Sequence, residues 1–139
     1  MGRSNSRNKT APPEENGLTF DAGGLIAVER SDRGVFLLML RAWTAGARLT
    51  VPATALAQVM RNPTRQVLLR RLVRQTTTDV VPLDAGDATN VGIVLAASRT
   101  TDITDAHVVI CAKRAGQPIV TSDPDDLSSL DPDAHLFVV

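Results

Sequence analysis

Three aspartates that lie far apart in the sequence each stand at the end of an apolar run. Asp21 follows the run 18–20, Asp105 opens an apolar helical run, and Asp123 closes the run 119–122. In an open parallel sheet, ligands collect at the carboxyl ends of strands, next to the point where the strand order reverses. If Asp21 and Asp123 end adjacent strands there and Asp105 lies on a helix that reaches the same crevice, the carboxylates converge. Such a cluster favours a divalent cation.

The segments that must position these carboxylates alternate between strands and helices. Thr104 is the expected N-cap of the helix that carries Asp105, since threonine accepts hydrogen bonds from free amides and an acid in the first turn suits the helix dipole. The alternation, with long crossovers, predicts an α/β fold with a mainly parallel sheet. We expect strands at 18–21, 48–51, 80–83, 118–121 and 136–139, and helices at 25–29, 32–45, 52–61, 65–75, 85–98, from 104 onward and at 124–130.

Length and composition indicate one globular domain. The chain has 139 residues, with 43% hydrophobic and 22% charged residues, and fifteen basic residues balance fifteen acidic ones, which argues against a strongly basic nucleic-acid binder. Cys111 is the single cysteine, so no intrachain disulfide forms and a reducing compartment fits. Residues 1–17 are polar and predict a flexible tail ahead of a domain at 18–139. Because no window approaches the roughly 18 apolar residues of a membrane span, a cytoplasmic location is expected.

Four motifs together resemble the PIN domains, and within them the VapC-type toxins of bacterial toxin-antitoxin pairs. They are LTFDA at 18–22, VPA at 51–53, DITDAH at 102–107 and VTSDPDDL at 120–127. The resemblance covers residues 18–139. It implies a three-layer sandwich with a mainly parallel central sheet flanked by helices. It also implies a Mg²⁺-dependent ribonuclease, with Mn²⁺ as a substitute, that a cognate VapB-type antitoxin neutralises and that forms homodimers.

The resemblance assigns roles to individual residues. Asp21 matches the metal ligand after the first strand, Asp105 the acid at a helix start, and Asp123 the acid after the fourth strand. Phosphodiester hydrolysis needs an activated water and neutralised charge on the departing oxygen, which carboxylate-held Mg²⁺ supplies. Asp102 either points into the same pocket or caps the loop. Thr121 and Ser122, which precede Asp123, are expected to support the site.

Gln58 is the departure from the PIN pattern that matters. PIN nucleases usually place a glutamate on the helix after the second strand, and Gln58 occupies that position here. An amide oxygen can orient a water or coordinate weakly, but it carries no negative charge, so affinity for a second cation should fall. Glu29 is a candidate for the missing carboxylate. Against that role, six residues of helix move the backbone by about 9 Å.

For several other polar residues the sequence allows two interpretations, one functional and one structural. His107 could act as a general base, but it lies one turn into an apolar helix, where a packed or hydrogen-bonded histidine is the commoner case. Asp125 and Asp126 are expected to end a short helix or face solvent. A phosphate-binding rim and a solvated helix face are both open for the arginines, since arginine pairs well with phosphate oxygens. These arginines are Arg61, Arg65, Arg70, Arg71 and Arg74.

The sequence therefore predicts a metal-dependent endoribonuclease toxin of the PIN class. The alternative is a PIN-like protein in which Gln58 has weakened or abolished catalysis and which acts as a binding or regulatory partner. A phosphoacceptor signalling domain also clusters acids at strand ends. It would need an acidic pair near the first strand, whereas Asp21 stands alone.

Overall fold

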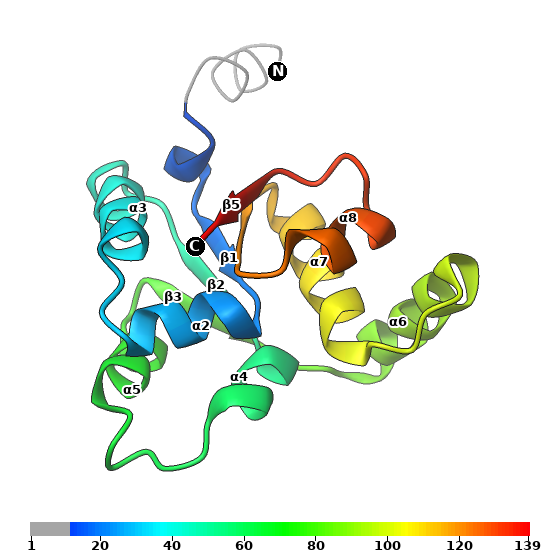
Figure 1. The fold of residues 1–139 in the computed structure, drawn as a ribbon, viewed down its shortest axis with the longest axis horizontal. Helices are drawn as coiled ribbons and strands as arrows, with labels where there is room; N and C mark the ends of the chain where they lie inside the picture. The colour runs from blue at the N-terminus through cyan, green and yellow to red at the C-terminus, as the bar shows by residue number, and fades with distance from the viewer. Residues whose placement is uncertain (1–11) are drawn as a thin grey trace.

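The computed structural model describes residues 12–139, and its centre is a five-stranded sheet in which every strand pairing is parallel (Figure 1). The strand order is β3-β2-β1-β4-β5. This confirms the α/β class and the parallel sheet that the alternating pattern predicts. The strands are β1 (Leu18–Phe20), β2 (Leu49–Pro52), β3 (Thr78–Val81), β4 (Ile119–Thr121) and β5 (Leu136–Val138).

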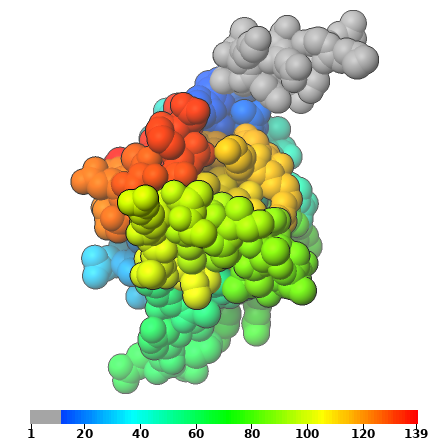
Figure 2. Space-filling view, turned by 90° about the vertical axis from the view of Figure 1, so that its right-hand side faces the viewer, coloured from blue at the N-terminus to red at the C-terminus, as the bar shows by residue number. Residues whose placement is uncertain are grey.

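Helices flank the sheet on both sides, which gives the three layers (Figure 1). On one side α2 contacts β1 and β4, and α5 contacts β3, while on the other side α7 contacts β1, β2 and β4. Figure 2 shows α6 as the outermost element on its face, in front of α7. The helices are α2 (Ala22–Glu29), α3 (Arg33–Thr44), α4 (Ala53–Val59), α5 (Val67–Arg74), α6 (Ala85–Ser98), α7 (Ile103–Ala115) and α8 (Pro124–Leu130).

The three central strands are buried along their whole length. Every residue of β1, β2 and β4 is buried, whereas the edge strands β3 and β5 hold no fully buried residue. A strand covered by helices on both faces has a continuous run of apolar residues, without the alternation of apolar and polar residues that a half-buried strand shows. This is why runs such as 18–20 and 119–121 point to central strands without any period of two.

The strand order reverses at β1, which lies between β2 and β4. Thr19 pairs with Thr50 on one side and with Ile119 on the other. The carboxyl ends of β1 and β4 are therefore neighbours. Asp21 follows β1 directly, and Asp123 follows β4 after one residue. The expectation that Asp21 and Asp123 stand at adjacent strand ends is confirmed.

Three sequence-based expectations need correction. Within the predicted tail, residues 1–11 lie outside the described part, but Pro13–Asn16 form a short 3-10 helix, η1. Glu14 in η1 is buried and pairs with Arg41 of α3, an ion pair with a long-range partner that composition does not reveal. β3 begins at Thr78, two residues early, because an edge strand tolerates polar residues there. Helix α7 is capped by Asp102 and not by Thr104.

None of the helices in residues 12–139 combines the length and apolar character that crossing a membrane would require.

Candidate metal centre at the carboxyl edge

Asp21 is the buried member of the site. It is the N-cap of α2, and its carboxylate accepts a hydrogen bond of 2.8 Å from the Gly24 amide, which holds it at the end of β1. Only 5% of the residue is exposed. Burial raises the pKa of Asp21, and the negative charge of Asp123 raises it further, while hydrogen bonds from Thr121 and Gly24 oppose the shift. A carboxylate that is costly to ionise favours a nearby cation.

Asp123 approaches Asp21 from the neighbouring strand end. Its amide donates to the Thr121 hydroxyl at 2.9 Å, which turns the chain away from β4 and into α8. Asp126, in the first turn of α8, joins the group. The charge of Asp123 is the main cause that raises the pKa of Asp126, with a hydrogen bond between the two carboxyls as a second cause.

Asp102 and Asp105 approach from α7. Asp102 caps this helix by accepting a hydrogen bond of 2.9 Å from the Asp105 amide. Its negative charge also raises the pKa of Asp105, and both residues line the same pocket. Asp102 therefore caps α7 and also points into this pocket. Partial burial raises the pKa of Asp105 to about 7, followed by the charges of Asp102, Asp21 and Asp126.

These five aspartates form what we call the acidic edge: Asp21, Asp102, Asp105, Asp123 and Asp126. A cleft of about 280 Å³ opens between α7 and α8, and Asp102, Asp105 and Asp126 line it with residues of the 100–101 loop and the end of α8. Burial raises the pKa values of Asp21 and Asp105, and the charges of neighbouring aspartates raise those of all three titrating members, Asp21, Asp105 and Asp126. Hard oxygen ligands in this number suit Mg²⁺, which uses a few carboxylates and keeps waters. These oxygen donors therefore suit a divalent cation in kind, and no three of them lie within 4.8 Å of one another in the described residues.

A second and larger cavity, of about 360 Å³, lies at the opposite end of the sheet. Residues from η1, the end of α7 and the 131–135 loop line it. It mixes acidic and basic groups, including Lys113, Asp131 and His135, and gathers no carboxylate cluster. The chemistry therefore places the candidate site at the acidic edge.

Glu29 is not brought to the acidic edge. It is the last residue of α2, and its carboxylate accepts a hydrogen bond from the side-chain amide of Gln66. The same amide group donates to the Val59 carbonyl, and its oxygen accepts from the backbone amides of Arg61 and Asn62. Glu29 thus helps to hold the loop between α4 and α5.

The remaining sequence-predicted residues lie on α4, on the loop that follows it and just after β4. Gln58 is exposed on α4. Ser122 is exposed and lies against Gly23 of α2. Arg61 donates to the Ala57 and Met60 carbonyls and so caps the end of α4, while Arg65 is exposed on the following loop.

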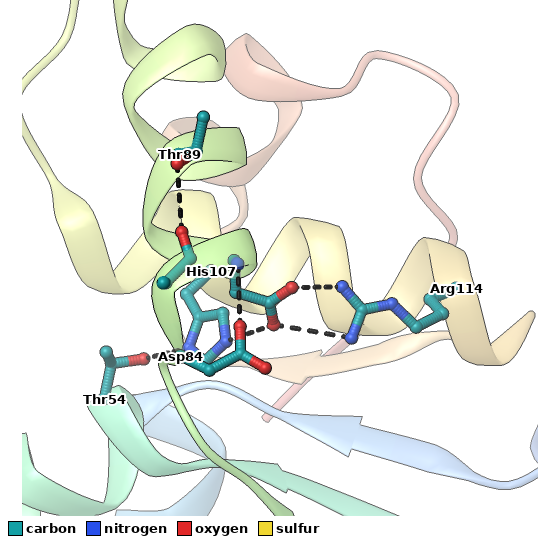
Figure 3. A network of polar contacts seen from close by, with 7 residues as sticks. Thr54, Asp84, Thr89, His107 and Arg114 are labelled. Carbon is teal, nitrogen blue, oxygen red and sulfur yellow. Dashed lines mark hydrogen bonds and ion pairs between the residues drawn. The ribbon is translucent and has the colours of Figure 1, made fainter.

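His107 belongs to a buried polar network (Figure 3). Its ring is fully buried; Nε2 lies 3.1 Å from Asp87 of α6, and Nδ1 lies 2.8 Å from the Thr54 hydroxyl. Arg114 donates to the same Asp87 carboxylate. The hydrogen-bonded reading of His107 is confirmed.

Within residues 12–139, one set of three His, Cys or acidic ligand atoms lies within 4.8 Å of one another: Asp87, His107 and Cys111. Hydrogen bonds already occupy both Asp87 oxygens and both His107 ring nitrogens. Burial, followed by the Asp87 charge, raises the pKa of the Cys111 thiol to about 11, which disfavours a thiolate ligand. We therefore interpret the set as part of the hydrogen-bond network.

Comparison with known proteins finds similarity in fold but none in sequence. No model of a known protein family matches the chain, and no curated protein does. Solved structures do match. VapBC2 from Rickettsia felis, bound to a DNA fragment from their promoter, aligns with 88% of this chain and 98% of that chain at 11% identity and a TM-score of 0.65. The chain has a PIN-like fold.

Two further structures agree. FitAcB from Neisseria gonorrhoeae aligns with 86% of this chain and 96% of that chain, at 16% identity and a TM-score of 0.52. FitAB bound to an IR36 DNA fragment aligns with 87% and 94%, at 13% identity and a TM-score of 0.54. VapC and FitB are the PIN-domain toxins of these toxin-antitoxin complexes. The likeness establishes the PIN-like fold, and the roles of single residues rest on the geometry above.

Sequence reasoning missed Asp126. A signal was available, because Asp123 and Asp126 are three residues apart across a helix start at Pro124. That spacing turns the later side chain back toward the N-terminus of the helix.

Proposed function

We propose that the protein is a metal-dependent endoribonuclease toxin that hydrolyses RNA phosphodiester bonds. The observation that carries the proposal is the acidic edge, where five aspartates gather near the ends of β1 and β4 and the start of α7. Burial, followed by the charges of Asp102, Asp21 and Asp126, raises the pKa of Asp105 to about 7 there. A cluster of this kind is unfavourable without a cation, and an enzyme that must bring a divalent cation to a phosphate requires one.

In this proposal the five aspartates have different roles. Asp21, Asp105 and Asp123 hold Mg²⁺ or Mn²⁺, and the cation supplies positive charge for the phosphate and lowers the pKa of water. The Gly24 amide and the Thr121 hydroxyl fix the Asp21 carboxylate. Asp102 stabilises the start of α7 and so orients Asp105. Asp126 adds negative charge on the α8 side.

The partners are proposals too. The similar solved structures are toxin-antitoxin complexes, which supports a VapB-type antitoxin as the partner that restrains this chain in the cytoplasm. Leu37 and Leu40 are about half exposed on α3, beside a shallow surface lined by Phe36 and Arg33. Apolar helix surfaces of this kind suit contact with an antitoxin or with a second copy of the chain.

The test is cleavage of a mixed structured-RNA substrate by purified, antitoxin-free protein. We expect wild type to cut with Mg²⁺ or Mn²⁺ and not with a chelator, and Asp21→Asn and Asp123→Asn to lower the rate by at least about 100-fold. Asp133→Asn is the matched control, since Asp133 is an exposed aspartate at the opposite cavity. Cutting that survives Asp21→Asn would contradict the proposal.

Gln58 favours a second candidate function. A neutral amide in place of the usual glutamate weakens the site's attraction for cations, which suits a binding or regulatory PIN-like protein. Calorimetry with Mn²⁺ separates the two. Carboxylate-dependent binding together with cleavage supports the nuclease, whereas folded wild type that neither binds Mn²⁺ nor cuts RNA supports the binding partner.

A further inference from the structure

A cavity of about 350 Å³ lies at the amino end of the sheet, at the starts of β2 and β3. Two turns form its walls. Trp43, Gly46 and Ala47 line it from the end of α3 and the turn into β2, and Gln75 and Thr77 line it from the turn between α5 and β3. The two turns lie side by side because β2 and β3 are paired strands. A volume of this size is typical of small-molecule sites.

Hydrogen bonds fasten the two turns to each other. The Leu49 amide donates to the Thr77 carbonyl at 3.0 Å. The Arg48 guanidinium donates to the Thr76 carbonyl at 2.8 Å and forms an ion pair with Asp79, also at 2.8 Å. The cavity is therefore pre-formed, and a ligand that enters it has little protein left to order.

The lining of the cavity combines an aromatic side chain with an amide. Trp43 is the single tryptophan of the chain, and it is only partly buried although it packs against the core. Within residues 12–139, two enclosed side-chain oxygens lack a hydrogen-bond partner, Gln75 Oε1 and Thr78 Oγ1, and both belong to the start of β3 and the turn before it. Such atoms are rare in native proteins. Because no partner holds Oε1, the Gln75 amide is free to turn and to offer a ligand either its oxygen or its NH₂ group.

The surface beside the cavity is positively charged. Arg74 immediately precedes Gln75, Arg71 lies one turn earlier on α5, and both are exposed. Neither forms an ion pair with another residue of the described part of the chain, whereas Arg48 is occupied by Asp79. Arginine pairs well with phosphate oxygens. The charge of this surface is therefore complementary to a phosphate backbone, and an aromatic face with a hydrogen-bonding amide suits the attached base.

We propose that this cavity is an RNA subsite, in which an unpaired base stacks on Trp43 while Arg71 and Arg74 contact the phosphates beside it. The inference rests on the proposed function, because the ligand is the RNA substrate, and it adds a place of recognition remote from the acidic edge. The four residues of β2 separate the two ends of the sheet by about 13 Å. An RNA strand that occupies both places is therefore several nucleotides long. Since an aromatic face accepts any base, the subsite selects single-stranded RNA and not a particular sequence.

The test uses the fluorescence of Trp43 itself. The chain has one tryptophan and no tyrosine, so the emission reports on this cavity alone. The probe is oligouridylate of about 12 nucleotides, which is unpaired and long enough to leave the cavity. It is added to the non-cleaving Asp21→Asn protein. We expect saturable quenching with the same midpoint as the binding curve from fluorescence anisotropy. Binding without quenching would overturn the inference.

Further outcomes separate this inference from the proposed function. Wild type that cuts the mixed RNA substrate, although oligouridylate does not quench Trp43, would overturn the inference alone. Protein that neither cuts that substrate nor binds oligouridylate would overturn both. Uridine monophosphate at the same concentration should quench much less, because it does not reach the arginines of α5 with several phosphates. Equal quenching by uridine monophosphate would indicate a site for free nucleotides and overturn the assignment to RNA.

Variants of α3 test the stacking. In the Asp21→Asn background, Trp43→Leu should weaken oligouridylate binding about tenfold in anisotropy, whereas Trp43→Phe keeps an aromatic face and should stay within about threefold. Phe36→Leu is the matched control, since Phe36 is also a partly buried aromatic residue of α3 that packs against the core, but it lies on another surface. We expect the control to bind like its parent. Equal losses from Trp43→Leu and Phe36→Leu would indicate general destabilisation and overturn the inference.

Discussion

Asp105 carries the largest electrostatic strain in the acidic edge. Its pKa rises from 3.8 to about 7, so the folded chain binds this proton more tightly than the unfolded chain does. The stabilisation from that proton is fully present below the unfolded pKa and is lost as pH rises through the folded pKa. The raised pKa values of Asp21 and Asp126 act in the same direction.

We therefore predict that the metal-free protein loses stability between about pH 5.5 and about pH 8, as measured by urea unfolding at each pH. Asp105→Asn should flatten this dependence, because the amide does not ionise. Saturating Mg²⁺ should flatten it as well. Asp79 and Asp87 have lowered pKa values, so their contributions are lost only in more acidic solution. Equal stability at both pH values would show that the acidic edge is not strained.

Single residues also show the limits of the sequence. Asp21, Asp105 and Asp123 follow from the sequence because each stands at the end of a readable apolar run. The partner of Glu29 does not, since Gln66 is distant in sequence and a side-chain hydrogen bond leaves no periodic signal. The link between His107 and Thr54 is hidden for the same reason.

At the scale of elements, α2 lies close enough to β4 to require a glycine. A Cβ at Gly24 would clash with the Val120 carbonyl oxygen, a backbone atom that cannot move aside alone. We predict that Gly24→Ala lowers the free energy of unfolding by about 1–3 kcal/mol, measured by urea denaturation. Gly92→Ala on exposed α6 is the control. A Cβ there meets nothing within 4 Å, so stability should rise by about 0.5–1 kcal/mol.

The loop between α4 and α5 depends on one buried amide. Gln66 is 8% exposed and satisfies two backbone amides, the Val59 carbonyl and the Glu29 carboxylate. Gln66→Ala should lower the free energy of unfolding by about 1–3 kcal/mol in chemical denaturation, because these partners lose their bonds. The exposed Gln58→Ala should change it by less than about 0.5 kcal/mol. Similar losses in both variants would contradict the assigned role.

Helices and strands could be predicted where the local sequence pattern determines them. The range of α6 and that of α8 match the predicted helices at both ends, and β1, β2 and β4 lie where apolar runs indicate. The start of β3 and the short η1 were not predictable. Edge pairing permits Thr78 and Asp79 in β3, and η1 is held by an ion pair with α3.

At the scale of the whole molecule, zero net charge conceals a separation of charge. Aspartates gather at the acidic edge, while the exposed arginines Arg65, Arg71 and Arg74 lie on α5 and the loop before it. If this surface binds the RNA backbone, Arg65→Ala should reduce the slope of log affinity against log salt by about 0.7. The measurement uses fluorescence anisotropy with the non-cleaving Asp21→Asn background. Arg48→Ala, which removes an arginine paired with Asp79, should leave the slope unchanged.

The pairing of β1 with β4 has a consequence for the synthesis of the protein. Residue 19 is in register with residue 119, so the two strand ends that bear Asp21 and Asp123 meet across most of the chain. Contacts so distant in sequence form late, after the intervening chain has been made. A nascent chain on the ribosome therefore lacks the acidic edge until its last strands emerge. Under the proposed function, the nascent nuclease could not cut RNA near the ribosome before β4 has been made and has paired with β1.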